Sequence, residues 1–151
     1  MMEGIAVPLK QLDPELPIPA YAYPGDAGVD LRSTIDLVLH PFERALVPCG
    51  IAVSIPRGYA GFVLPRSGLA IKHGVSLVNA PGLIDSGYRG ELQSVLVNLD
   101  AHKPFEIKRG DRIAQLVIMR VSEATFELHE KLPETKRGSG GFGSSGVSLS
   151  V

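Results

Sequence analysis

The segment at residues 79–91, NAPGLIDSGYRGE, brings a carboxylate, a phenol and a guanidinium close together at Asp85, Tyr88 and Arg89. A positioned carboxylate can activate a water molecule, and an aromatic ring can lie against a planar ligand. Taken alone, the segment is also typical of a surface turn, because Asp, Ser and Gly favour turns for conformational reasons. Its chemistry therefore depends on what the rest of the chain places beside it.

Two runs rich in Val and Leu, residues 75–78 and 92–99, flank this segment and predict a β-hairpin. The prolines and glycines between them supply the fixed or positive φ and the close backbone approach that tight turns need. The tip of such a hairpin exposes backbone N–H and C=O groups. We therefore expect a tip that can read the edge of a planar ligand and activate water.

A second candidate is the sequence PRSGLA at residues 65–70, where a predicted strand ends and a short helix over residues 67–73 begins. Free N–H groups and the helix dipole at such a junction favour an anion, and Arg66 and Ser67 add donors. The alternative is an ordinary Ser N-cap. Gly68 favours the anion site, since a missing side chain permits close approach of a phosphate.

Two polar residues stand near predicted strands. Asp30 in AGVDL at residues 27–31 is either a turn-forming residue or a carboxylate for a hydrated Mg²⁺. Gln115 interrupts an apolar run, so its amide is either satisfied by backbone or directed into a site. The sequence RGDR at residues 109–112 predicts a tight turn before that run.

The remaining chain shows short strands and almost no helical period. The 17 glycines and 12 prolines punctuate these strands at short intervals. This spacing is typical of an all-β antiparallel sandwich, jelly roll or small barrel. The run at 112–121 is apolar on both faces and predicts a central, fully covered strand. Further strands are predicted at residues 5–9, 35–39, 44–47, 51–55, 60–64, 105–108 and 126–129.

Composition limits the classes of function. A chain of 151 residues fits one domain, and 15 basic against 16 acidic residues, without a basic block, argue against polymeric nucleic acid as a partner. A small anionic ligand stays compatible. The single cysteine, Cys49, favours an intracellular compartment, and we expect a cytoplasmic protein with no membrane contact, because no apolar run approaches about 20 residues.

The composition changes after Pro133, where KRGSGGFGSSG at residues 136–146 offers almost nothing to bury except Phe142. We expect one domain over residues 1–135 and a mobile Gly/Ser-rich arm over residues 136–151. A plain flexible tail is the alternative. Arg137 and Phe142 favour an arm that folds over a nucleotide, with Arg137 on phosphate and Phe142 on a base.

Five segments in a fixed order resemble the motifs of the trimeric dUTP diphosphatases (dUTPases): AGVDL, PRSGLA, the 79–91 hairpin, RGDRIAQL at 109–116 and RGSGGFGSSG at 137–146. The resemblance covers essentially the whole chain. It implies a β jelly roll, or distorted β-barrel, assembled as a homotrimer with active sites at the subunit interfaces. It also implies Mg²⁺-dependent hydrolysis of dUTP to dUMP and pyrophosphate, which lowers dUTP and supplies dUMP for thymidylate synthesis.

The resemblance also implies roles for individual residues. Asp85 corresponds to the carboxylate that deprotonates the attacking water, and Tyr88 to the ring that lies under deoxyribose and excludes a 2′-hydroxyl. Asp30 corresponds to a metal contact made through water. Uracil would be read by backbone groups and side chains at Asn79, Leu83, Ile84 and Gln93. The phosphates would be bound by Arg66, Ser67, Gly68 and Gln115, with Gln115 also counted as catalytic, and by the arm residue Arg137, while Phe142 stacks on the base of a neighbouring subunit's site.

Two other functions are weighed against this one. The related dCTP deaminases, including bifunctional ones with diphosphatase activity, need a second serine, an arginine and a glutamate where this chain has Gly68, Ile71 and Val95. None of these three can transfer a proton or stabilise a leaving amine. A nucleotide-binding regulator without catalysis is the third hypothesis, and Asp85, together with the expected phosphate ligands, argues against it.

Overall fold

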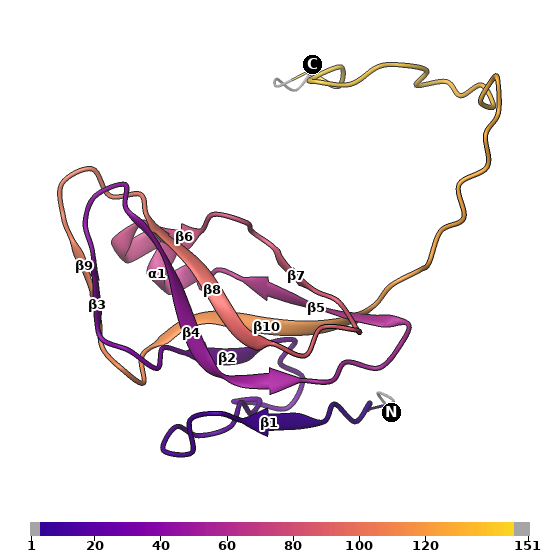
Figure 1. The fold of residues 1–151 in the computed structure, drawn as a ribbon. Coiled ribbons are helices and arrows are strands. Elements are labelled where there is room, and N and C mark those ends of the chain that lie inside the picture. Colours follow the sequence, from indigo (N-terminus) through magenta and orange to yellow (C-terminus); the bar gives the residue numbers. More distant parts are fainter. Residues whose placement is uncertain (1–3, 147–151) are drawn as a thin grey trace.

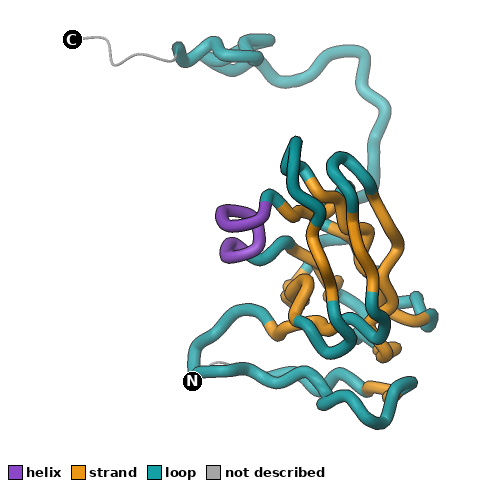
Figure 2. Tube along the Cα trace, turned by 90° about the vertical axis from the view of Figure 1, so that its left-hand side faces the viewer, coloured by secondary structure: helices purple, strands orange, loops and turns teal. Residues whose placement is uncertain are grey.

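The computed structural model describes residues 4–146, and its body is built from short β-strands with one helix (Figure 1). Helix α1 lies at one side of the stacked strands (Figure 2). These elements confirm the predicted all-β, jelly-roll-like fold with one short helix. In chain order they are β1 (Leu9–Gln11), β2 (Val29–Arg32), β3 (Leu37–Leu39), β4 (Arg44–Val53), β5 (Tyr59–Leu64), α1 (Ser67–His73), β6 (Val75–Leu77), β7 (Gly82–Ile84), β8 (Glu91–Asn98), β9 (Phe105–Ile107) and β10 (Arg112–Arg120).

Antiparallel pairing links the strands into two four-stranded sheets, ordered β1-β4-β8-β6 and β2-β10-β5-β7, and a β3-β9 ribbon. Strand β8 shows how the sequence builds the core, because Leu92 and Leu96 are buried while Gln93 between them is exposed. All three sheets contribute to one hydrophobic cluster, which includes Leu31, Leu39, Val47, Val63, Leu92, Leu96, Ile107 and Ile113. Gln93 is thereby directed away from the core.

Several predicted strands differ from the observed ones. The predicted strands at 44–47 and 51–55 form one strand, β4, whose register against β8 shifts between Pro48 and Ala52. At this bulge Gly50 has φ +71°, and its N–H donates to a carboxylate oxygen of Glu91 at 2.8 Å. The strand predicted at 5–9 is wrong except at Leu9, because only residues 9–11 reach the edge of β4.

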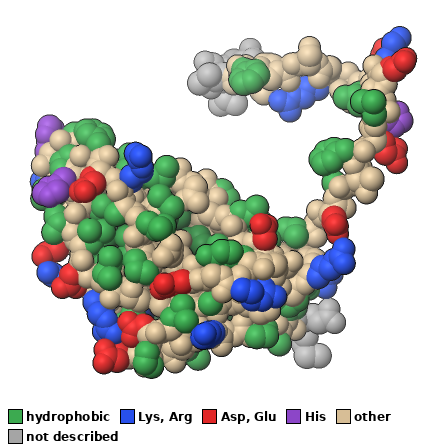
Figure 3. Space-filling view, in the orientation of Figure 1, with side chains coloured by type: hydrophobic (Ala, Val, Ile, Leu, Met, Phe, Trp, Pro, Cys, Tyr) green, Lys and Arg blue, Asp and Glu red, His purple; other side chains and the backbone are tan. Residues whose placement is uncertain are grey.

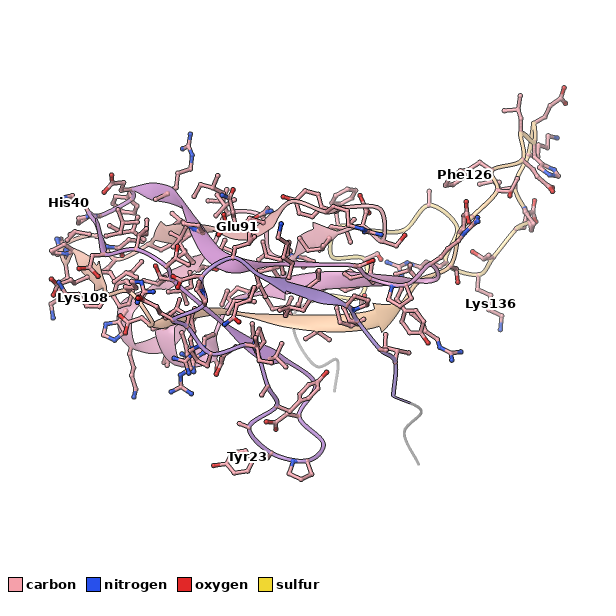
Figure 4. All side chains as sticks on the ribbon, turned by 60° about the horizontal axis from the view of Figure 1, so that its bottom comes forward. Tyr23, His40, Glu91, Lys108, Phe126 and Lys136 are labelled. Atoms are coloured by element: carbon pink, nitrogen blue, oxygen red, sulfur yellow. The ribbon has the colours of Figure 1, made fainter. Side chains whose placement is uncertain are left out.

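Strand β10 is central, between β2 and β5, as predicted. The prediction that it is fully covered is wrong, because only its first half is buried and Met119 is 49% exposed. Its second half borders an apolar groove of about 920 Å³, here called the β10 groove, which Tyr21, Tyr23 and Tyr59 also line. Tyr23 lies on a loop that projects from the body (Figure 4).

Beyond β10 the chain leaves the body as an extended arm (Figures 1 and 3). The strand predicted at residues 126–129 is wrong, since no strand forms there. Among residues 4–146, nothing covers Phe126, Leu128 and Leu132, and Phe126 is 96% exposed. Figure 4 shows Phe126 on the arm, away from the body. The chain therefore leaves the body near residue 121, and the first part of the arm carries these three apolar side chains among charged ones. The predicted boundary after residue 135 stays a prediction.

Within residues 4–146, no helix has the length and apolar character needed to cross a membrane.

Candidate functional site

The predicted hairpin is present, but both large sheets hold it. Strands β6 and β8 pair antiparallel, with Leu77 opposite Leu96. The connection between them contains β7, which pairs with β5 of the other sheet, with Leu83 opposite Phe62. The hairpin tip is thus fixed from two directions.

A pocket of about 250 Å³ opens at this tip, and we call it the hairpin pocket. Two leucines and an isoleucine form its apolar part, and two carboxylate residues, a tyrosine and a glutamine form its polar part. This combination suits a flat ring with polar edges. The structure gathers five predicted site residues here, and the complete lining is Leu46, Leu83, Ile84, Asp85, Tyr88, Glu91 and Gln93.

Hydrogen bonds fix Tyr88 within the tip. Its backbone N–H donates to the Asp85 carbonyl at 3.0 Å, which closes the turn. Its phenol donates to the Glu91 carbonyl at 3.0 Å. Glu91 is itself tied through its side chain to Gly50 in the β4 bulge, so the residue that accepts the hydrogen bond of the phenol is also held in place. The sequence analysis did not predict Glu91 as a pocket residue. Its position at the end of the hairpin motif is a signal that could have indicated this role.

Asn79 is predicted to read the base, but it is not among the residues that line the hairpin pocket. Its amide lies against the start of β7, where a Cβ added at Gly82 would be 3.3 Å from the Asn79 side-chain nitrogen. Gly82 is buried, so the amide lies directly against the backbone of β7. Asn79 is therefore next to the strand that carries Leu83 and Ile84.

A second group of predicted residues forms around Asp30, and we call Asp30, Arg66 and Arg112 the Asp30 cluster. Arg66 Nε lies 3.0 Å from one carboxylate oxygen of Asp30, and Arg112 Nη1 lies 3.3 Å from the other. Arg66 also donates to the Arg112 carbonyl at 3.0 Å. Two guanidinium groups share one carboxylate, which leaves an excess of positive charge at a partly exposed site and favours an anion.

These contacts correct one reading and add one residue. Asp30 lies within β2, so its interpretation as a turn residue is wrong. The sequence analysis placed Arg112 only in a turn and did not predict it as a site residue. The signal that could have indicated it is the second arginine of RGDR. Because β2 and β10 are neighbours, Asp30 and Arg112 come together only through the sheet order.

The first turn of α1 lies directly beside this cluster. Arg66 is the N-cap residue, and no side chain caps the helix, so the alternative of a Ser67 N-cap is wrong. The first backbone N–H groups of a helix have no intrahelical partner. A Cβ at Gly68 would meet nothing within 4 Å, so the approach to these groups is open.

Gln115 joins the same region. It lies opposite Asp30 on β2 and opposite Leu64 on β5, and its Nε2 donates to the Pro65 carbonyl at 2.8 Å. It also lines a pocket of about 400 Å³ together with Gly28 and Asp30. The interpretation that a backbone group satisfies this amide is therefore confirmed, and its direction into a functional site stays a prediction.

One chain does not bring the two groups together. Strand β7 runs antiparallel to β5, and Ile84 lies opposite Gly61, five residues before Arg66. Five residues of strand span roughly 17 Å, and Asp85 continues in the opposite direction from Arg66. The arm also lies apart in this chain, where Arg137 Nε donates to the Gly140 carbonyl and Phe142 is fully exposed.

The donor set bears on Mg²⁺. Among residues 4–146, no group of three or more His, Cys, Asp or Glu side chains is arranged to hold a metal. Mg²⁺ usually keeps several waters and binds through one or two carboxylates together with substrate phosphates. A single carboxylate such as Asp30, partly exposed beside an anion-binding region, fits an ion that is held mainly by a triphosphate.

Comparisons with known proteins agree with one another. The dUTPase family model matches residues 14–146. A deoxyuridine 5′-triphosphate nucleotidohydrolase of Rhodococcus erythropolis is 56% identical over 97% of this chain and 89% of its own length. One of Thermobifida fusca is 55% identical over 94% of this chain and 79% of its own length.

Solved structures give the same result. A mutant dUTPase of Staphylococcus bacteriophage 80alpha with dUpNHpp matches with a TM-score of 0.86 and 30% identity, over 94% of this chain and 99% of that one. A mutant dUTPase from phage phi11 of S. aureus, described for its coordination of a structural Mg(II) ion, matches with a TM-score of 0.79 and 26% identity, over 86% of this chain and 100% of that one.

Proposed function

The chain belongs to the dUTPase family and is an enzyme that hydrolyses dUTP, and we propose that Asp85 activates the attacking water. The water oxygen forms a bond to the α-phosphorus, and the bond from this phosphorus to the bridging α,β-oxygen breaks. Asp85 takes the proton of the water. The products are dUMP and pyrophosphate. The observation that carries this proposal is the hairpin pocket, where the Asp85 carboxylate borders a space suited to a flat base.

Uracil is selected by the polar groups of the hairpin. Uracil presents O4 as an acceptor and N3–H as a donor, and backbone groups at Leu83 and Ile84, with Gln93 and Asn79, can match this pattern. Cytosine presents the reverse pattern, which would leave buried polar groups unpaired. The narrow turn also excludes the 5-methyl group of thymine. Tyr88 lies under the deoxyribose, where its ring leaves no space for a 2′-hydroxyl.

The triphosphate is bound by the region around the Asp30 cluster. The excess positive charge at Arg66 and Arg112, and the uncapped N–H groups at Ser67 and Gly68, support this assignment. The side-chain amide of Gln115 has two N–H groups, and one of them donates to the Pro65 carbonyl. The other can donate to a phosphate oxygen near the reacting phosphorus.

Asp30 would hold Mg²⁺ through a water molecule while its oxygens stay paired with Arg66 and Arg112. The ion would supply neutralisation of the charge that develops on the phosphate oxygens. The chain's own residues hold the substrate so that the α-phosphorus faces the water at Asp85. Positioning of this kind supplies a large share of phosphoryl-transfer catalysis.

The complete site is shared within a homotrimer. Asp85 follows β7 and Arg66 follows β5, and the antiparallel pairing of these strands places the two residues too far apart in one chain to bind the same triphosphate. This separation supports a site built from two subunits. The uncovered side chains of Phe126, Leu128 and Leu132 support an arm that leaves its own subunit, and the open β10 groove offers apolar surface to receive it. Residues 136–146 of the predicted arm then act as a mobile segment, with Arg137 on the γ-phosphate and Phe142 on uracil, and the rest of the predicted arm, residues 147–151, lies outside the described residues.

The enzyme works in the cytoplasm, where it lowers dUTP and supplies dUMP for thymidylate synthesis. The free thiol of Cys49 is compatible with a reducing compartment. Burial raises the pKa of this thiol to about 11, so it stays protonated and unreactive at neutral pH.

A turnover assay with dUTP, dCTP, dTTP and UTP in parallel tests the proposal. We expect pyrophosphate release from dUTP only, in the presence of Mg²⁺. Ammonia release from dCTP would support the deaminase alternative, which Gly68, Ile71 and Val95 disfavour. Tight binding of dUTP without turnover would support the regulator.

A further inference from the structure

The ring of Tyr88 occupies the space that a side chain at position 90 would fill. A Cβ built on Gly90 would overlap Tyr88 Oη and would lie 2.6 Å from Cζ and 3.0 Å from Cε2. These three atoms are the nearest neighbours of that position, and all belong to one ring. The phenol oxygen that would clash with this Cβ belongs to the hydroxyl that donates to the Glu91 carbonyl.

The backbone at Gly90 does not require glycine for conformational reasons. Its φ lies outside the left-handed region, unlike that of Gly50 or Gly110. An alanine could therefore adopt this backbone, and the obstacle is the ring alone. Gly87, on the same tip, also has an ordinary φ, but a Cβ there would meet nothing within 4 Å.

From this contact we infer that Gly90 is a positioning residue for sugar specificity, which acts through Tyr88. The inference rests on the proposed role of Tyr88 under the deoxyribose. A methyl group at position 90 forces the outer edge of the ring to move by several tenths of an ångström or more. This movement breaks the hydrogen bond to the Glu91 carbonyl and takes the ring out of contact with the C2′ face of deoxyribose.

The loss falls on dUTP more than on UTP. A deoxyribose gains the close contact with the ring, whereas a ribose is kept from it by its 2′-hydroxyl. Displacing the ring therefore removes an interaction that only the deoxynucleotide has. We expect the ratio of kcat/KM for UTP to that for dUTP to rise in Gly90→Ala by about tenfold or more, the scale of one poorly fitted group in a pocket.

Four variants test the inference with UTP and dUTP as paired substrates: Gly90→Ala, Gly87→Ala, Tyr88→Ala and the double variant Tyr88→Ala/Gly90→Ala. Gly87→Ala should keep the wild-type ratio, because its methyl group points into open space. The double variant should show the ratio of Tyr88→Ala, because no ring remains to be displaced. A purely structural role of Gly90 would lower both kcat/KM values together and leave their ratio unchanged.

The outcomes separate the inference from the proposed function. If Tyr88→Ala leaves the ratio unchanged, the proposed role of Tyr88 is wrong. If Tyr88→Ala raises the ratio and Gly90→Ala does not, the role of Gly90 is overturned. If Gly90→Ala alone does not fold, the double variant decides, and a ratio different from that of Tyr88→Ala would show that Gly90 does not act through the ring.

Discussion

The hairpin pocket and the Asp30 cluster hold their side chains in different ways. In the hairpin pocket, strand pairing on both sides and hydrogen bonds to backbone carbonyls fix the tip and the Tyr88 ring. In the Asp30 cluster, charged side chains from three separate elements hold one another by ion pairs, with side-chain exposures of 27% to 50%. The first arrangement is suited to recognising shape and the second to recognising charge. We expect substitutions in the pocket to alter chemistry and selectivity, and substitutions in the cluster to alter affinity in a salt-dependent way.

The largest expected effect comes from the base in the hairpin pocket. Asp85→Asn should cut kcat by at least about 10²-fold, because the amide has nearly the same shape but cannot accept the proton of water. Binding of a non-hydrolysable dUTP analogue should stay close to wild type. Glu123→Gln removes the same charge from a carboxylate that is 83% exposed and is the matched control. Wild-type turnover in Asp85→Asn would mean that another residue is the base.

The arm is expected to act on turnover more than on stability. Deleting residues 137–151, of which 147–151 lie outside the described residues, should lower kcat by about 10- to 10²-fold, because arm closure positions the triphosphate. The melting temperature of the body should change little, since the described part of this segment contributes no contact to the core. In the full-length chain, Arg137→Gln and Phe142→Ala separate the phosphate contact from the base contact. A lowered melting temperature with a normal kcat would make the arm a structural tie between subunits.

Mixed trimers test whether the two regions of one site come from different chains. Asp85→Asn subunits carry intact arms, and truncated subunits carry an intact Asp85. Reassembled together, they should recover activity in up to about a quarter of the sites if each site takes its arm from a neighbour, because the two chains combine at random. Sedimentation should first show the trimer. Absence of recovery in verified mixed trimers would mean that each arm serves its own subunit.

The sequence predicted the features that depend on local chemistry. The helix at Ser67–His73 and the strand β5 follow from short patterns of apolar residues and glycine, and both lie where the sequence placed them. The hairpin was predicted from two apolar runs, but the pairing of β7 with the opposite sheet was not, because three residues carry no periodic signal. A bulge that joins two predicted strands into β4 likewise depends on the partner strand rather than on the run itself.

The site shows the same division. Asp85 and Tyr88 were predicted from the continuous segment 79–91 and Gln93 from the family resemblance, and all three lie in one pocket. Arg112 was missed because its contact with Asp30 joins residues 82 positions apart, through the order of β2 and β10. Residues that assemble through sheet order leave no trace in spacing along the chain. The contribution of Arg112 is therefore the part of the site that most needs a direct test.

Arg112→Gln should have a smaller effect than Asp85→Asn or the deletion of residues 137–151. It removes one guanidinium from the Asp30 cluster and leaves Asp30 paired with Arg66. Ion pairs of this exposure are worth up to about 1 kcal/mol, so KM for dUTP should rise about two- to fivefold with kcat little changed. The rise should shrink as salt increases, because the partly exposed charges are screened. Arg57→Gln, whose side chain is 88% exposed and pairs with Glu123, carries the same charge change as a control. If Arg112→Gln matched this control in KM and in salt dependence, the Asp30 cluster would not bind phosphate. If kcat fell at unchanged KM, Arg112 would instead contact the transition state.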